Sequence, residues 1–194
     1  MASMENSVQN ILDESIEQAN RSLESQELLK QAQDMVIKNE KVDKDTAPIS
    51  RITVLGGVLW NKTKGSLSVM DEHKYAGHFL TGYPNPLKVT GNFGMSALSN
   101  KGVKAAVVYS GKNKQGVECG WLLAFADTKN TGRRIYGECG AIDKFANIDW
   151  AQVETNLNNA GAVAEPSDQA TGTSLYARIV GSSGKSAVGG VFSG

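Results

Sequence analysis

The sequence has little of what metal sites, disulfide frameworks and nucleophilic catalysis require. It holds two cysteines, Cys119 and Cys139, and two histidines, His73 and His78, in 194 residues. Two cysteines are too few for a disulfide framework, so we expect free thiols at small buried positions. The histidines are five residues apart, and residues so spaced on a strand point to opposite faces, which disfavours a bidentate metal site. We therefore predict no metal and no cofactor.

Charge of one sign and long hydrophobic runs are absent as well. Lys+Arg and Asp+Glu both number 20, and no basic stripe with interleaved aromatics occurs, so we expect no nucleic-acid partner. The neutral balance also disfavours simple electrostatic capture by an anionic lipid surface. No stretch approaches the roughly 20 apolar residues that cross a bilayer. The first residues lack a charged stretch followed by an apolar one, so we predict no secretory signal and a cytoplasmic location.

Catalytic motifs are missing too. Glycine is abundant, but no phosphate-binding or dinucleotide-binding glycine motif occurs, and the carboxylates are scattered. Two alternatives stay open: a loop that gathers the histidines with Asp71 or Glu72 around a metal, and a cysteine–histidine pair in an unrecognised hydrolase. Neither has positive support, so we predict that the protein is not an enzyme.

A helical segment precedes residue 45. No glycine or proline occurs before Pro48, and apolar residues recur at spacings of three and four, which is typical of an amphipathic helix. Its stripe includes Ile11, Ile16, Leu23, Leu28 and Met35. An isolated helix is marginally stable in water, so we predict that the stripe packs on the rest of the chain or on a second copy. We divide the chain into a helical segment with its linker, 1–45, and a β domain, 46–194.

The remainder predicts a β-sandwich. All 21 glycines lie after residue 50, and short apolar runs alternate with turn-rich pieces. Eight or nine short strands at this spacing are typical of two packed antiparallel sheets. One helix near 149–158 interrupts them, because Asp149 can cap it and Trp150, Val153 and Leu157 share one face. The core candidates are Val54, Val58, Val107, Trp121, Leu123, Ile135 and Ile179.

One turn-rich segment concentrates rings, prolines and a titratable group. Loops on a rigid scaffold are where binding residues usually lie, and amphipathic rings suit a lipid interface or a sugar. We therefore expect one wall of a ligand site at an end of the sandwich, where Tyr83→Ala and His78→Ala would weaken binding. The candidate ligand-binding residues are Tyr75, His78, Phe79, Tyr83, Pro84 and Phe93.

Several runs, in this order, resemble the plant jasmonate-induced protein family. They are Tyr75-Ala-Gly-His78, Tyr83-Pro84, Asn100–Ser110 with its Ala-Val-Val-Tyr, Cys119-Gly-Trp-Leu-Leu-Ala-Phe125, Arg134-Ile-Tyr-Gly-Glu138 and Gly189-Gly-Val-Phe192. The resemblance spans residues 50 to 194. That family looks related to the actinoporin-like sandwiches, among them the fungal lipid-binding protein nakanori. The resemblance implies a two-sheet sandwich with small helices and a stress-responsive plant protein.

Two classes of function follow. In the first, the chain is a non-catalytic binding module of plant defence, whose sandwich loops hold a lipid headgroup or a glycan. In the second, it is an interaction protein whose front helix docks a partner or forms a homo-oligomer. Exposed aromatics at residues 75–93 would favour the first class, and buried ones the second.

Overall fold

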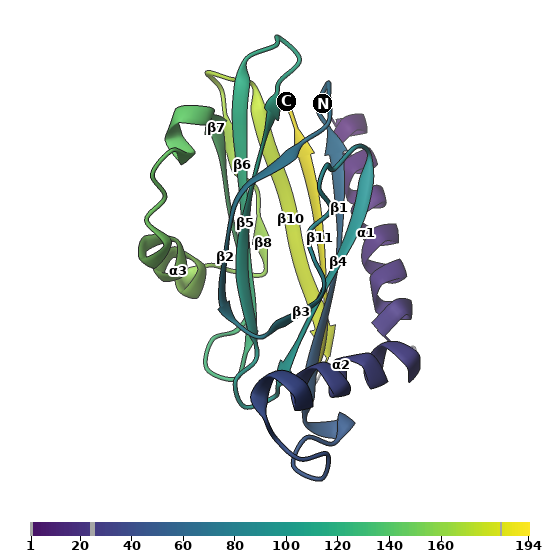
Figure 1. The fold of residues 1–194 in the computed structure, drawn as a ribbon. Helices are drawn as coiled ribbons and strands as arrows, with labels where there is room; N and C mark the ends of the chain where they lie inside the picture. Colours follow the sequence, from purple (N-terminus) through teal and green to yellow (C-terminus); the bar gives the residue numbers. More distant parts are fainter. Residues whose placement is uncertain (1, 24–25, 183) are drawn as a thin grey trace.

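Two β-sheets pack face to face and helices cover their outer faces in the computed structural model, which describes residues 2–23, 26–182 and 184–194 (Figure 1). The mainly β sandwich predicted from the sequence is confirmed. The helices are α1 (Ala2–Leu23), α2 (Gln26–Glu40) and α3 (Trp150–Asn159), with two 3-10 turns, η1 (Ile49–Arg51) and η2 (Ile142–Phe145). The strands are β1 (Ile52–Lys62), β2 (Ser68–Ala76), β3 (His78–Thr81), β4 (Thr90–Leu98), β5 (Val103–Lys112), β6 (Glu118–Thr128), β7 (Gly132–Ala141), β8 (Val163–Ala164), β9 (Ser167–Asp168), β10 (Thr173–Ser182) and β11 (Lys185–Ser193).

One pair of strands departs from the predicted antiparallel pattern. The larger sheet has the order β3-β4-β1-β11-β10-β8, with β9 also pairing β10, and the smaller has the order β2-β5-β6-β7. Within the larger sheet, β1 and β11 run parallel, with Val54 opposite Lys185 and Lys62 opposite Ser193. Strand β11 is antiparallel to β10 in the β10–β11 hairpin, and it lies beside β1 running in the same direction as β1.

The space between the sheets holds the main core. Trp121, Tyr109, Phe125 and Phe192 are its largest fully buried side chains. Five of the seven predicted core residues lie here, namely Val107, Trp121, Leu123, Ile135 and Ile179. Val54 and Val58 are also buried, but on the outer face of the larger sheet beneath the helices. Successive strand residues point to opposite faces, so a strand covered on both sides reads as continuously apolar.

The helical segment packs on its own sandwich, which is one of the two arrangements predicted for it. Leu12 and Ile16 of α1 and Val36 of α2 are buried against the outer face of the larger sheet. Of the predicted stripe, Ile11 and Met35 are half-buried, and the side chains of Leu23 and Leu28 lie outside those that the structure describes. No helix in the described ranges is long and apolar enough to cross a membrane.

The short helix predicted near 149–158 is α3, and it covers the opposite outer face of the sandwich. The Asp149 carboxylate accepts from the backbone N–H groups of Ala151 at 3.0 Å and Gln152 at 3.1 Å, which satisfies two of the free donors at the helix start. Val153 and Leu157 then pack on the smaller sheet. The following stretch contains the two-residue strands β8 and β9.

A single glycine separates two strands that belong to different sheets. Strand β2 ends at Ala76 in the smaller sheet, and β3 begins at His78 in the larger. Gly77 between them has a φ of 88°, and a Cβ there would lie 2.9 Å from Val103 Cγ1. Only glycine adopts this conformation without strain, so the chain crosses between the sheets at this residue.

Candidate functional site

The six residues predicted to bind a ligand do not form a common wall. Phe79, Tyr83 and Phe93 lie in or against the core between the sheets, and Pro84 borders it. Tyr75 and His78 lie on opposite outer faces of the sandwich. That any of them contacts a ligand stays a prediction. Tyr83 and Phe93 are buried, and the other four are half-buried: Tyr75, His78, Phe79 and Pro84.

Phe79, Tyr83 and Phe93 form an aromatic cluster inside the molecule. The ring of Tyr83 lies 5.1 Å from that of Phe79 and 5.2 Å from that of Phe93, and Phe93 lies 5.1 Å from Phe125. Tyr83 is 9% exposed and Phe93 is 3% exposed. The carbonyl of Pro84 accepts from the Tyr109 hydroxyl at 2.8 Å. Three of the aromatics that the sequence concentrated in one turn-rich segment therefore belong to the core of the sandwich.

Tyr75 and His78 lie on opposite faces because the chain changes sheets between them. The Tyr75 hydroxyl donates to the Trp150 carbonyl at 2.7 Å and ties β2 to the start of α3. Burial, reinforced by the charges of Glu154 and Asp149, raises the pKa of Tyr75 to about 12. His78 lies beneath α2, with its Nε2 3.5 Å from a carboxylate oxygen of Glu40. Both side chains hold helices on the sheets.

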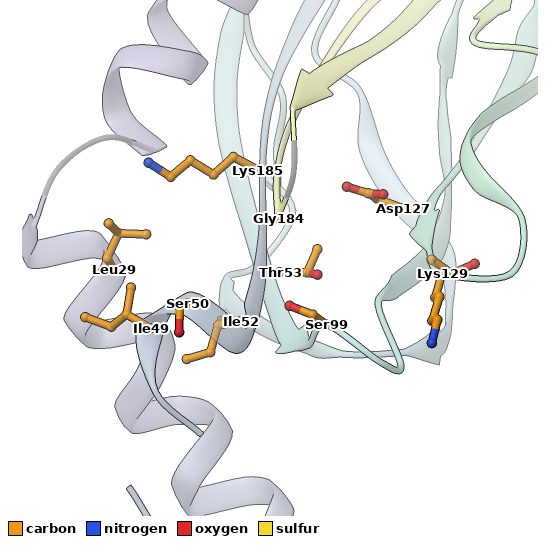
Figure 2. Close-up of a pocket in the computed structure, with 11 residues that line it drawn as sticks. Leu29, Ile49, Ser50, Ile52, Thr53, Ser99, Asp127, Lys129, Gly184 and Lys185 are labelled. Atoms are coloured by element: carbon orange, nitrogen blue, oxygen red, sulfur yellow. The ribbon is translucent and has the colours of Figure 1, made fainter. Parts of the chain in front are cut away.

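A hollow lies at one end of the sandwich, beside α2 (Figure 2). It has a volume of about 450 Å³, which lies within the range of small-ligand sites. Three parts of the chain meet there: α2 with η1, the start of β1 with the β4–β5 turn, and the ends of β6 and the β10–β11 hairpin. We call it the end cleft.

The strand side of the end cleft is polar. Thr53 and Ser99 present hydroxyls near its middle, and Asp127 directs its carboxylate toward this part (Figure 2). Two positive groups lie at the borders: the Lys185 ammonium extends toward the helical side, and the Lys129 ammonium lies at the opposite border (Figure 2). The Asp127 carboxylate accepts from the Ser186 hydroxyl, which fixes it at the end of β6. The balance of ionisable groups is one carboxylate to two ammonium groups, so the cleft has both a cation-attracting and an anion-attracting part.

The helical side of the end cleft is apolar. Leu29 of α2 lines it with Ile49 and Ile52 (Figure 2), and Ile49 is 44% exposed. Leu29 and Ile49 also line a second, more open hollow of about 750 Å³ between α2 and residues 44–48. The two hollows share these side chains, so the cleft is polar on one side and continues into an apolar border on the other.

Backbone contacts hold the walls of the cleft together. The Ser99 N–H donates to the Arg51 carbonyl at 2.8 Å, and the Val54 N–H donates to the Gly184 carbonyl at 2.8 Å. Gly102 has a φ of 75°, and a Cβ there would lie 2.3 Å from the Asp127 carbonyl oxygen. Any side chain at this position would displace the segment that carries Asp127.

An ion pair anchors α2 beside the cleft. The side chain of Glu40 is 5% exposed and contacts the Lys101 ammonium and His78. Burial raises the pKa of Glu40, but hydrogen bonds from Lys101 and the Leu98 backbone, with the charges of Lys101 and His78, outweigh it and lower the pKa below its usual range. The carboxylate therefore stays ionised and holds the end of α2 at the β4–β5 turn.

Sequence reasoning missed the end cleft because its residues come from five separate stretches. Ser, Thr, Asp and Lys at turns are ordinary surface residues, and no local pattern connects Thr53 with Asp127. The buried cysteines offer no competing chemistry: burial raises the pKa of both thiols, Cys119 and Cys139, which keeps them protonated and unreactive.

Comparisons with known proteins give the context of this site. No known family profile matches the chain. A jasmonate-induced protein homolog of Atriplex canescens is 32% identical over 139 residues, covering 68% of this chain and 75% of that relative. Among solved structures, the crystal structure of the lipid-binding protein nakanori is similar, with a TM-score of 0.61 and 13% identity, covering 90% of this chain and 83% of that one. At this identity the structural likeness establishes the fold.

Proposed function

The chain belongs to the jasmonate-induced protein family, and from this premise we propose that it is a non-catalytic, jasmonate-responsive defence protein of the cytoplasm that binds lipid, with the end cleft as its headgroup site. The observation that carries this proposal is that one carboxylate and two lysines line the same hydroxyl-bearing cleft. The described lipid-binding function of nakanori, which shares the fold, supports the class of ligand.

The charges of the cleft complement a zwitterionic headgroup. Lys129 and Lys185 can each attract a phosphate, and Asp127 can attract an ammonium or quaternary ammonium group. The hydroxyls of Thr53 and Ser99 can donate to the phosphate oxygens. A neutral zwitterion therefore fits better than an anion, because an anion would leave Asp127 facing like charge.

The apolar side of the cleft suits the first carbons of an acyl chain. Leu29, Ile49 and Ile52 lie across from the polar groups, and the hollow beyond Leu29 and Ile49 continues this surface. Covering an exposed side chain such as Ile49 is favourable at about 25 cal/mol per Å² of apolar area. We therefore expect a single-chain phospholipid to bind more tightly than its free headgroup.

The test is a calorimetric titration with three probes: phosphocholine, dodecylphosphocholine below its micelle concentration, and methyl glucoside. We expect dodecylphosphocholine to bind most tightly. Asp127→Asn keeps an acceptor for Ser186 and removes the charge, so it should weaken binding about fivefold, which corresponds to about 1 kcal/mol. The matched control is Asp71→Asn, which changes an exposed carboxylate on β2 and should bind as the parent does.

Two outcomes would overturn this assignment. If Asp127→Asn binds dodecylphosphocholine as tightly as Asp71→Asn does, the headgroup site lies elsewhere. If methyl glucoside binds and the two choline probes do not, the hydroxyl-rich wall serves a glycan, the second ligand class that the sequence suggested.

Burial of Tyr83 and Phe93 is the outcome that we expected to favour docking through the helical segment, but the packing of the helices themselves gives this alternative less support. Leu12, Ile16 and Val36, the buried apolar residues of α1 and α2, face the chain's own sheet and are not free for a partner. A homo-oligomer formed through this segment stays a prediction, and the mass measured by light scattering would test it.

A further inference from the structure

The end of the sandwich opposite the end cleft gathers lysines from three loops. Lys62 ends β1 and Lys64 follows it, and Lys88 lies in the loop before β4. Lys112 ends β5, and Lys114 lies in the β5–β6 turn. All five side chains are exposed. We call this surface the lysine end; it lies beside the chain termini in Figure 1, away from α2.

Backbone contacts place these loops side by side. The Asn61 N–H donates to the Val89 carbonyl at 2.8 Å, and the Asn61 side chain donates to the Lys88 carbonyl at 3.1 Å. On the other side, Ser68 pairs with Ser110, next to Lys112. The three lysine-bearing loops are therefore neighbours and do not merely share an end of the molecule.

Opposite charge is nearly missing from these three loops, and the acidic residue Asp168 lies behind them, in contact with Thr171, whose carbonyl accepts from Asn113. Residues 61–66, 85–89 and 111–118 contain five lysines and one acidic residue, Glu118, which leaves a net charge of +4 on a chain whose total is zero. Glu118 lies 3.5 Å from Lys112, and both side chains are more than half exposed. The fold thus separates charges that balance over the whole chain, so this end can attract an anionic surface although the net charge of the chain is zero.

Apolar side chains project from the same loops. Val89 is 60% exposed and Val117 is 48% exposed, and they are the two most exposed large hydrophobic residues in the described part of the chain. The Lys62 ammonium also lies 5.4 Å from the centre of the Trp60 ring, which is half-buried near this end. Cations interleaved with exposed apolar side chains match the headgroup layer of an anionic bilayer.

We propose that the lysine end docks on anionic lipid bilayers. The lysines approach the phosphate and serine groups, and Val89 and Val117 enter the layer between headgroups and acyl chains. A soluble polyanion such as nucleic acid would gain nothing from the two valines, so their position among the lysines favours a lipid surface. This surface is independent of the end cleft: β1 runs from Ile52 at the cleft to Lys62, and its 11 residues span about 36 Å.

Co-sedimentation with vesicles tests the proposal. The full chain should bind phosphatidylcholine vesicles that contain about one third phosphatidylserine more tightly than pure phosphatidylcholine vesicles, and added salt should reduce the difference. Each lysine near an anionic surface contributes about fivefold to partitioning. The double variant Lys88→Gln/Lys114→Gln should therefore bind the anionic vesicles on the order of 20-fold more weakly.

The control is Lys38→Gln/Lys74→Gln, which makes the same change in net charge at exposed lysines of α2 and β2. It should bind as the parent does, and Val89→Ser/Val117→Ser should weaken binding even in salt that screens the lysines. Melting temperatures of all variants should match, because every changed side chain is exposed.

Equal losses in the two lysine variants would show that net charge alone acts and would overturn the proposal. Unchanged binding of the valine variant, together with tight binding of short duplex DNA that depends on Lys88 and Lys114, would assign the surface to a polyanion instead. Lys88→Gln/Lys114→Gln should still bind dodecylphosphocholine as tightly as the parent does, because neither lysine lines the end cleft, so failure of the end-cleft proposal is distinguishable from failure of this one.

Discussion

Tyr83 offers a sharp test of whether the central aromatics serve the core or a ligand. Its ring contacts Phe79 and Phe93 at centroid distances of 5.1 and 5.2 Å, and the residue is 9% exposed. Its hydroxyl has no hydrogen-bond partner among the residues that the structure describes. Burial, with smaller effects of Glu72 and Tyr109, raises its pKa well above the usual value, so the hydroxyl stays neutral.

Two substitutions separate the ring from the hydroxyl. Tyr83→Ala removes the ring and should cost about 3–5 kcal/mol of unfolding free energy, as other buried aromatic truncations do. At about 2–4 °C per kcal/mol for a chain of this size, the melting temperature should fall by roughly 6–20 °C. Tyr83→Phe keeps the ring contacts and removes a desolvated, unpaired hydroxyl, so stability should be unchanged or rise by up to about 1 kcal/mol.

Thermal unfolding followed by circular dichroism, with calorimetry as a second probe, measures both variants. The reasoning is refuted if Tyr83→Phe lowers the melting temperature by more than a few degrees (~2–4 °C per kcal/mol), because the hydroxyl would then have a partner. It is equally refuted if Tyr83→Ala unfolds at the temperature of the parent, since the ring would not be part of the core.

Two further predictions concern the helical segment. Leu12→Ala should lower the unfolding free energy by about 2–5 kcal/mol in a denaturant titration, because Leu12 is fully buried against the larger sheet. The control Val163→Ala changes a 46% exposed side chain and should cost little. Equal effects of the two substitutions would mean that α1 is not docked on the sheet. The lowered pKa of Glu40 means that its ion pair stabilises the fold fully above pH 4.5 and loses this effect as the pH falls through the lowered value. Glu40→Gln should therefore be less stable than the parent near neutral pH, and the difference in melting temperature should shrink in acid; a constant difference would contradict the role of its charge.

The architecture could be predicted because its signals are local. Glycine-punctuated apolar runs predicted the strands, and Asp149 with Val153 and Leu157 predicted α3 from capping and a shared face. Even Val54 and Val58 were correctly expected to be buried, although the sequence could not show that helices cover their side of the sheet. Periodicity indicates that a face is covered, and tertiary contacts decide what covers it.

The candidate sites could not be predicted because their signals are not local. Rings near Pro84 suggested an exposed wall, but the crossing at Gly77 sends Tyr75 to one outer face and Phe79 to the core. The end cleft and the lysine end each combine residues from loops far apart in the sequence. Sheet register alone brings Lys88 beside the end of β1, and no count of charges along the chain reveals it.

The parallel pairing of β1 with β11 has a consequence for how the chain is made. These strands are separated by more than 120 residues, yet β11 forms one side of β1 and lies beneath α1. While a ribosome is still adding the intervening residues, β1 has an open edge and α1 lacks part of the surface on which it packs. Contacts at such separation form slowly, and unpaired strand edges promote aggregation. The nascent chain should therefore depend on chaperones until β11 has emerged, although much of the smaller sheet can assemble earlier.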